Sequence, residues 1–210
     1  MDRRWWVPLL ILCAGALALW PLRGALTAEG IAARSPRQAW LAAAFLLALY
    51  AVKSLSVAFP LSALEAAGGM LFPLPAALAV NACGVAVAQA VPYLLGRRQR
   101  GGLGALRERF PALAALAPPA ENGAGRAVFL LRLGGASPGD LVSMYLGAAG
   151  VPWRAYFVGG LLGSLPRAAS ATLLGTALWE IGGDRFWLSL GAGGLLTAVS
   201  LVLWRAWRRG

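Results

Sequence analysis

The sequence predicts an all-α integral membrane protein with about four spanning helices and two broken or re-entrant helical hairpins. Of its 210 residues, 59% are hydrophobic and 13% are charged, and the mean hydropathy is +0.67. Apolar runs recur along the chain, and a run of about 18 residues or more can cross a hydrocarbon core of roughly 30 Å. Prolines and glycines interrupt two of these runs. This composition excludes an ordinary soluble domain.

The positive charge of the chain points to lipid headgroups and not to nucleic acid. Lys and Arg together number 19 against 8 for Asp and Glu, which gives a net charge of +11. These basic residues gather at the ends of apolar runs, at Arg3 and Arg4, in residues 97–109 and in residues 205–209. Anionic headgroups lie at those depths. We therefore expect membrane lipids as partners.

The residue types needed for metal or covalent chemistry are scarce. The chain has no His, and its two cysteines, Cys13 and Cys83, both lie inside apolar runs. A metal site, a disulfide framework and a nucleophile with an imidazole base are therefore not expected. We predict no cofactor and no enzymatic activity.

The two ends of the chain each predict one spanning helix. In the N-terminal segment, residues 1–39, Arg and Trp residues precede an apolar run over residues 7–22, as in a signal-anchor helix, and a polar connection follows. An Ala-x-Ala triplet at residues 16–18 leaves a cleaved signal as the alternative. The C-terminal segment, residues 181–210, combines an apolar run at 186–204 with a basic tail. We expect both termini in the cytoplasm.

The central segment, residues 40–180, contains the first interrupted run. The run from Trp40 to Phe59 carries Lys53, which is expected to extend its amine to the membrane interface. Residues 61–96 contain Pro and Gly breaks, which predict a broken helix or re-entrant hairpin with its tip near residues 72–75. Residues 97–122 are polar and rich in Arg, and we interpret them as a cytoplasmic loop.

The second interrupted run covers residues 127–150, with a breaker cluster at 134–140 between two arms of about ten residues. A spanning helix should follow, from Pro152 to about Trp179. Placing the Arg-rich loop and both termini inside the cell gives four full crossings and two broken segments that do not change side. Whether the two hairpins enter from the same or opposite faces stays open, as does the oligomeric state, including a homo-oligomer.

Four ionisable residues beside the breaks are the candidate binding residues: Glu65, Arg132, Asp140 and Arg167. A charge at membrane depth costs about 2.5–3.5 kcal/mol, so such residues usually face a site or a partner. Half-helix N-termini suit a phosphate, and a buried carboxylate can exchange protons. The alternative is a structural role as fixed ion pairs, Glu65 with Arg132 or Asp140 with Arg167.

Other polar and small residues in the apolar runs predict packing. Asn81 and Gln89 lie eight positions apart and are expected to make hydrogen bonds between helices. Gly68, Gly69 and the glycines at 159, 160 and 163 allow close approach of helices.

Two stretches together resemble the DedA or VTT-domain superfamily, within it the Tvp38/Tmem64-like branch. The first runs from Phe59-Pro60 through Glu65-Ala-Ala-Gly-Gly-Met-Leu-Phe72 to Tyr93-Leu-Leu-Gly-Arg97. The second contains Phe129-Leu-Leu-Arg132, Pro138, Asp140-Leu-Val-Ser-Met-Tyr-Leu-Gly147 and Gly163-Ser-Leu-Pro166. The resemblance implies two re-entrant hairpins, location in the bacterial inner membrane, and movement of phospholipid or polyprenyl phosphate. By position, Glu65 is similar to the acid of the first hairpin and Arg132 to the arginine of the second.

The leading functional hypothesis is a lipid or lipid-phosphate transporter or scramblase, linked to protons. Arg132 would bind the phosphate, Glu65 and Asp140 would carry protons, Arg167 would be their partner charge, and Arg97, Arg98 and Arg100 would contact headgroups. The alternative is a membrane scaffold without transport activity, which recruits anionic lipid or an acidic partner through the Arg-rich loop.

Overall fold

The computed structural model describes residues 27–54, 60–98, 123–133 and 139–178, together with single positions at 14, 184, 187, 188, 191, 192, 194, 195, 198, 199 and 202. The described ranges form seven helices and no strand, which confirms the all-α prediction. The helices are α2 (Ala28–Arg34), α3 (Ala39–Lys53), α4 (Leu61–Leu71), α5 (Leu74–Arg97), α8 (Ala124–Leu133), α9 (Gly139–Ala148) and α10 (Trp153–Ala177).

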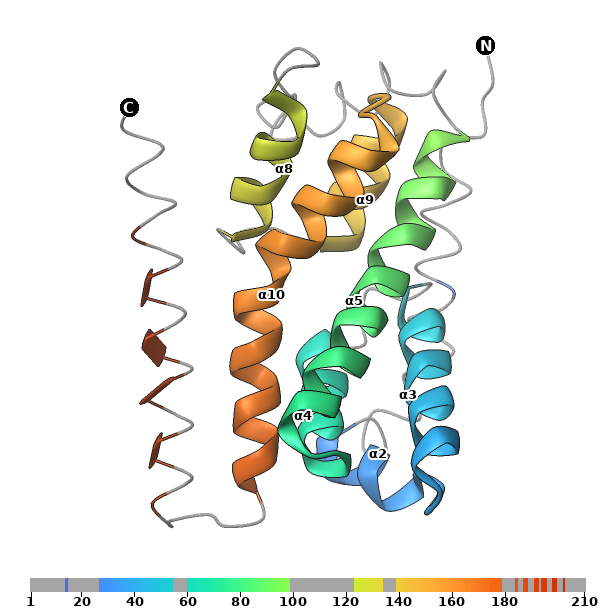
Figure 1. The fold of residues 1–210 in the computed structure, drawn as a ribbon. Coiled ribbons are helices and arrows are strands. Elements are labelled where there is room, and N and C mark those ends of the chain that lie inside the picture. Colours follow the sequence, from blue (N-terminus) through green and yellow to red (C-terminus); the bar gives the residue numbers. More distant parts are fainter. Residues whose placement is uncertain are drawn as a thin grey trace.

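Two long helices, α5 and α10, run the full height of the bundle in opposite directions (Figure 1). They have 24 and 25 residues, and at roughly 1.5 Å per residue each exceeds a hydrocarbon core of about 30 Å. Within the described ranges, these two helices are long and apolar enough to cross a membrane. The predicted runs at 7–22 and 186–204 lie wholly or mostly outside those ranges, so the count of four spans stays a prediction.

The prediction of a broken segment over residues 61–96 is confirmed for one break, and it is wrong for residues 74–97. Residues 74–97 form one continuous helix, although it contains Pro92. Pro75 lies in the first turn of α5, where a backbone N–H has no intrahelical partner and proline is tolerated. The break is confined to Phe72 and Pro73, which separate α4 from α5.

Four shorter helices each cover about half the length of a long one. The helices α3, α4, α8 and α9 have 15, 11, 10 and 10 residues, which is too short to cross a bilayer alone. In Figure 1, α8 and α9 lie beside the upper half of the bundle, and α3 and α4 lie beside the lower half. The described ranges therefore contain two sets of short helices at opposite ends of the molecule.

The predicted tip near residues 72–75 is not the break that lies in the middle of the bundle. The turn between α4 and α5 lies at the lower end in Figure 1, near the end of α10. The opposite end of α4, at Pro60, lies midway along the bundle, close in depth to the end of α3. The predicted tip is confirmed in its residues, since α4 ends at Leu71 and α5 begins at Leu74, but the turn lies at the lower end of the bundle and not in its middle. The interior break is the connection between α3 and α4.

Four glycines bring helix backbones into direct contact, in two matching sets. The first set joins α4 to α10 and the second joins α9 to α5; the contacts are Gly69 with Thr172 and Gly175 with Ala66, then Gly147 with Tyr93 and Gly96 with Met144. Corresponding residues are 78 or 79 positions apart (147 − 69 and 175 − 96). A side chain at any of the four positions would collide with backbone atoms.

The same spacing relates other positions. Pro73 precedes α5 and Pro152 precedes α10, 79 positions later. Gly84 lies against Tyr50 of α3, and Gly163 lies against Phe129 of α8, again with both members displaced by 79. The units α3–α4–α5 and α8–α9–α10 therefore repeat one arrangement, and their long helices run in opposite directions (Figure 1). We call them the first unit and the second unit.

The bundle has two apolar cores, and residues of both units contribute to each. The first is built around Leu46, Tyr50 and Leu64. The second is built around Tyr93, Tyr145 and Tyr156. The long helices α5 and α10 contact each other and carry residues of both cores. The predicted role of the glycines at 68, 69, 159, 160 and 163 in helix packing is confirmed, because each lies against a neighbouring element.

Candidate functional site

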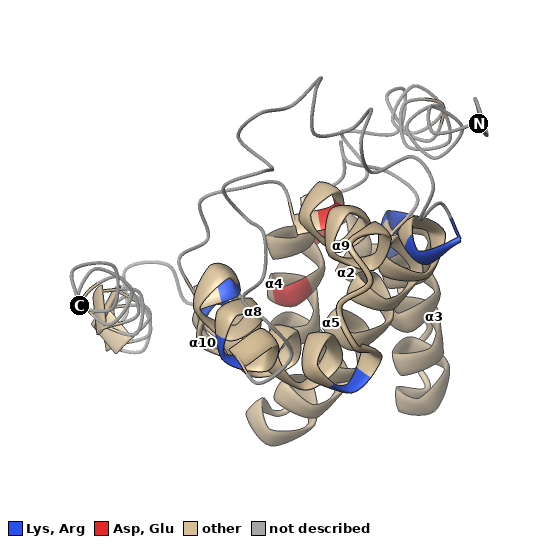
Figure 2. Cartoon of the chain, turned by 90° about the horizontal axis from the view of Figure 1, so that it is seen from above, with Lys and Arg blue, Asp and Glu red and all other residues tan. Residues whose placement is uncertain are grey.

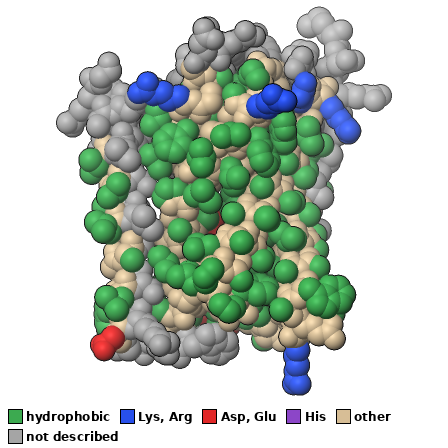
Figure 3. Space-filling view, viewed as in Figure 1, with side chains coloured by type: hydrophobic (Ala, Val, Ile, Leu, Met, Phe, Trp, Pro, Cys, Tyr) green, Lys and Arg blue, Asp and Glu red, His purple; other side chains and the backbone are tan. Residues whose placement is uncertain are grey.

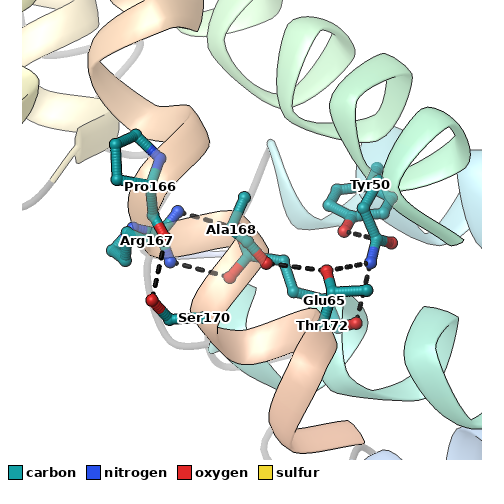
Figure 4. A network of polar contacts seen from close by, with 8 residues as sticks. Tyr50, Glu65, Pro166, Arg167, Ala168, Ser170 and Thr172 are labelled. Atoms are coloured by element: carbon teal, nitrogen blue, oxygen red, sulfur yellow. Dashed lines mark hydrogen bonds and ion pairs between the residues drawn. The ribbon is translucent and has the colours of Figure 1, made fainter. Parts of the chain in front are cut away.

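The acid of α4 is paired with the arginine of α10. Both guanidinium nitrogens of Arg167 lie 2.8 Å from the carboxylate oxygens of Glu65, in a bidentate ion pair (Figure 4). The Glu65 side chain is completely buried, whereas the Arg167 side chain is 44% exposed. The predicted alternative pairings, Glu65 with Arg132 and Asp140 with Arg167, are wrong. The helix register instead places Arg167, midway along α10, directly beside α4.

Asp140 forms the second ion pair, with Lys53. Both side chains are less than one-tenth exposed. The prediction that Lys53 extends to the membrane interface is wrong, because α3 ends at Lys53 inside the bundle and Asp140 begins α9 beside it. Figure 2 shows acidic positions inside the ring of helices. This pair connects the break of the first unit to the break of the second.

Arg132 ends α8 and binds the first turn of α9. Its guanidinium donates to the Gly139 carbonyl (3.0 Å), to the Ser143 hydroxyl (2.5 Å) and to the Tyr156 hydroxyl (3.2 Å). Its Nε is buried and has no hydrogen-bond partner among the described residues. Neither of the two ion pairs within the described ranges includes Arg132. A Cβ at Gly139 would lie 2.7 Å from its Nη1, so a side chain there would require the guanidinium to shift.

Asn81 is the centre of a hydrogen-bond network next to the Glu65 pair. Its amide nitrogen donates to the Glu65 carbonyl and to the Thr172 hydroxyl, each at 2.8 Å, and its oxygen accepts from the Tyr50 hydroxyl at 3.0 Å. Figure 4 shows how this network connects to α10 through Thr172. The predicted interhelical role of Asn81 is confirmed. Gln89 also reaches α10, with a longer contact of 3.5 Å to the Phe157 carbonyl.

Four exposed arginines lie at one end of the bundle, while Arg34 and Arg37 are exposed near α2 and the start of α3. Arg97 and Arg98 end α5, while Arg126 and Arg154 lie near the starts of α8 and α10. All four are exposed. Figure 3 shows basic side chains along the upper rim, above a face covered mostly by hydrophobic side chains. We call these four residues the arginine rim. The predicted headgroup contact Arg100 lies outside the described residues.

The chemistry of the interior is that of paired charges. Within the described ranges, no three His, Cys, Asp or Glu side chains are close enough to hold a metal ion. Among the described residues, three cations, Lys53, Arg132 and Arg167, lie at the helix breaks or beside the buried acids, against two acids, Glu65 and Asp140. The two acids are each paired, and the surplus positive charge is on Arg132. This arrangement can bind an anion.

An apolar helical bundle with spanning-length helices and charged groups at interior helix breaks defines a membrane protein. Comparison with protein families matches the VTT domain to residues 59–177, which is more than half of the chain. The chain therefore belongs to the VTT-domain family, the domain of the DedA and Tvp38 proteins. No curated protein and no solved structure matches the chain.

Sequence reasoning missed the part of the site that comes from α3. Lys53 is the single lysine of the chain, and it stands 79 positions before Arg132. That spacing is also the spacing of the repeated glycines, so the internal repeat is the signal that could have identified Lys53. Ser143 and Tyr156, which bind Arg132, carry no comparable signal, because a lone Ser or Tyr in an apolar helix is common.

Proposed function

We propose that this protein moves a membrane lipid or a lipid phosphate between leaflets, as a transporter or scramblase linked to protons. The observation that carries the proposal is the set of buried and half-buried charges at the interior ends of α3, α8 and α9, midway along α5 and α10. Charges at membrane depth are expensive and usually mark a substrate or ion pathway. No enzymatic step is part of the proposal.

The arrangement supports movement of a charged headgroup for a physical reason. A lipid that changes leaflet must carry its headgroup through a medium that solvates charge poorly, and fixed charges along the way lower that cost. In proteins built from inverted repeats, such sites lie near the midplane between the repeats. Arg132 supplies the phosphate contact, and Glu65 and Asp140 supply carboxylates that protonation would release from Arg167 and Lys53.

The arginine rim supports an orientation. Basic residues are retained on the cytoplasmic side, where anionic lipids attract them. We propose that the rim and both termini face the cytoplasm and that the membrane is the bacterial inner membrane. Accessibility of a cysteine at Arg154 to an impermeant maleimide in intact cells tests the orientation, and labelling from outside the cell would reverse it.

A leaflet-exchange assay tests the function. Purified protein is reconstituted into liposomes with fluorescent phospholipid or polyprenyl phosphate, at controlled internal and external pH. Exchange should occur with wild type and fall at least tenfold with Glu65→Gln and with Arg132→Ala. Arg34→Gln, an exposed change at the opposite end, is the control and should keep full exchange. Absence of exchange with folded wild-type protein under every gradient would reject the proposal.

A scaffold is the second candidate function, and the arginine rim is the observation that favours it. Four exposed arginines without an acidic residue beside them in these helix termini would bind anionic lipid or an acidic partner. Replacing Arg97, Arg98, Arg126 and Arg154 with Gln separates the two candidates. The scaffold predicts loss of function in cells with the interior charges intact, whereas the transporter predicts that leaflet exchange survives.

A further inference from the structure

At each of the two interior helix breaks, one cation lies at the end of the preceding helix. The two cations occupy equivalent positions in the repeat. Lys53 is the last residue of α3, and Arg132 is the next-to-last residue of α8. They are 79 positions apart, the spacing that also relates Gly84 to Gly163 and Tyr50 to Phe129 on the same helices. The repeat therefore presents one cation from each unit at the middle of the bundle.

Both cations reach the same turn of the same helix. Lys53 binds Asp140, and Arg132 binds the carbonyl of the adjacent Gly139 and the hydroxyl of Ser143. These partners all belong to the first turn or so of α9. The two cationic heads therefore converge on one short stretch of backbone, although they come from opposite ends of the molecule.

The two cations differ in the charge of the groups that they bind. Lys53 has a full carboxylate partner, and both side chains are almost completely buried. Arg132 has only neutral acceptors among the described residues, and its buried Nε has none. Arg132 is half-buried, and a cation at that depth whose partners are all neutral would be stabilised by an added anion. The cluster of Lys53, Arg132 and Asp140 is thus one negative charge short of neutrality.

We propose that Lys53 and Arg132 together form a binding site for a phosphate group, and that Asp140 is a tethered counter-anion which holds Lys53 until the phosphate displaces it. A phosphate diester supplies the missing single negative charge and acceptor oxygens for both cations. The proposal deepens the proposed function, because it names the group that holds the headgroup at the midpoint of its path. Glu65 and Arg167, which pair with each other in α4 and α10, are outside this site.

The alternative is that Lys53 and Asp140 only stabilise the fold. A fixed ion pair keeps most of its Coulomb attraction when the two charges are exchanged, although each charge then lies at the less favourable helix end. A binding site does not, because the exchange keeps two cations, at positions 132 and 140, but places a carboxylate at the end of α3, where it repels the phosphate. The double variant Lys53→Asp with Asp140→Lys therefore separates the two roles in folded protein.

Binding is measured on the detergent-solubilised full chain as the rise in thermal unfolding midpoint with added ligand. The probes are dioctanoyl phosphatidic acid, dioctanoyl phosphatidylglycerol and inorganic phosphate, with dioctanoylglycerol as the blank. Wild type should be stabilised by the two lipids and not by the blank. Stabilisation by inorganic phosphate as well would assign the site to the phosphate alone, and stabilisation by the lipids only would assign it to the phosphate with its acyl chains.

The variants are expected to change the affinity for lipid in opposite directions. Lys53→Met and Arg132→Met should each weaken lipid binding at least tenfold, and the exchanged double variant should fold, with a modest loss of stability, and also bind at least tenfold more weakly. Asp140→Asn should tighten binding at least tenfold, because the competing carboxylate is gone. Arg34→Met, at the exposed end of α2 and outside the arginine rim, is the matched control and should bind as wild type does. Equal binding by wild type, Asp140→Asn and the double variant would overturn the proposal.

The binding and leaflet-exchange measurements together distinguish failure of the two-cation site from failure of the proposed transport function. If the lipids bind as described but leaflet exchange is absent, the site stands and the transport proposal fails. If exchange occurs and Lys53→Met leaves both exchange and binding unchanged, transport stands and the two-cation site is wrong.

Discussion

The first and second units share a backbone arrangement but not a set of polar side chains. Close contacts of glycine with backbone recur at the same spacing in both. The polar positions do not recur: Glu65 corresponds to Ser143, Asp140 to Ser62, and Asn81 to Gly160. Among the charged interior positions, only the cations Lys53 and Arg132 match. The repeat therefore specifies helix packing, whereas the positions of the charged residues differ between the two units.

This difference has a consequence for any motion in which the two units exchange roles, as inverted repeats do in many transporters. An arrangement with the roles exchanged would place Arg132 opposite Ser62, and Ser143 opposite Ala88, because Ala88 corresponds to Arg167. Neither combination is an ion pair. The observed conformation is therefore the one in which both ion pairs can form.

The largest expected effect comes from removing the acid of the second unit. Asp140→Ala leaves Lys53 buried without a counter-charge, and breaking a buried pair in this way costs about 3–5 kcal/mol. The equivalent change in the first unit, Ser62→Ala, is at an exposed position and should alter stability by less than about 0.5 kcal/mol. Unfolding in mixed micelles measures both. Equal effects would mean that the Lys53 pair contributes nothing to the fold.

A smaller and symmetric effect is expected at the repeated glycines. Gly96→Val and Gly175→Val each force a side chain against the backbone of a packed helix, at Met144 and Ala66, and should each cost about 3 kcal/mol. Gly125→Ala is the control, because the nearest atom to its Cβ would be 3.6 Å away. The midpoint of thermal unfolding in detergent measures the three. A large loss at one of the two valine variants alone would contradict the equivalence of the units.

The smallest of the three expected losses of stability comes from replacing the side-chain amides of α5, and it should differ between Asn81 and Gln89. Asn81→Leu removes three hydrogen bonds and leaves the Tyr50 hydroxyl without its acceptor, which should cost about 1–2 kcal/mol. Gln89→Leu removes one long contact and an oxygen that has no partner, so its effect should be near zero. The midpoint of thermal unfolding in detergent compares the two leucine variants. A greater loss from Gln89→Leu would reverse the assignment of the network to Asn81.

Much of the helical fold could be predicted, and the errors have identifiable causes. The second break, the long helix after Pro152 and the bonding role of Asn81 follow from local signals: breakers, apolar length and a polar group that needs a partner. The break near Phe72 was also predicted, but not its place at the end of the bundle. Local signals mark where a helix stops and carry no information on the depth at which it stops.

The candidate site was predicted in its members and not in its pairs. An ionisable residue in an apolar run is visible in any sequence, so Glu65, Arg132, Asp140 and Arg167 could be selected. Lys53 was interpreted as an interfacial residue because it lies near the end of an apolar run. Its contact with Asp140 joins residues 87 positions apart, and no local pattern reports a contact over that distance.

The sequence by itself determined that the chain is apolar, helical and interrupted at set positions, because composition, period and the backbone limits of Pro and Gly act over a few residues. It also determined which charges must be compensated. The tertiary structure alone decided which charges compensate one another, since the packing of α4 on α10 and of α9 on α5 sets the depth of each short helix. That packing depends on glycines far apart in the chain, which let backbones touch and so bring Lys53, Asp140 and Arg132 to one turn of α9.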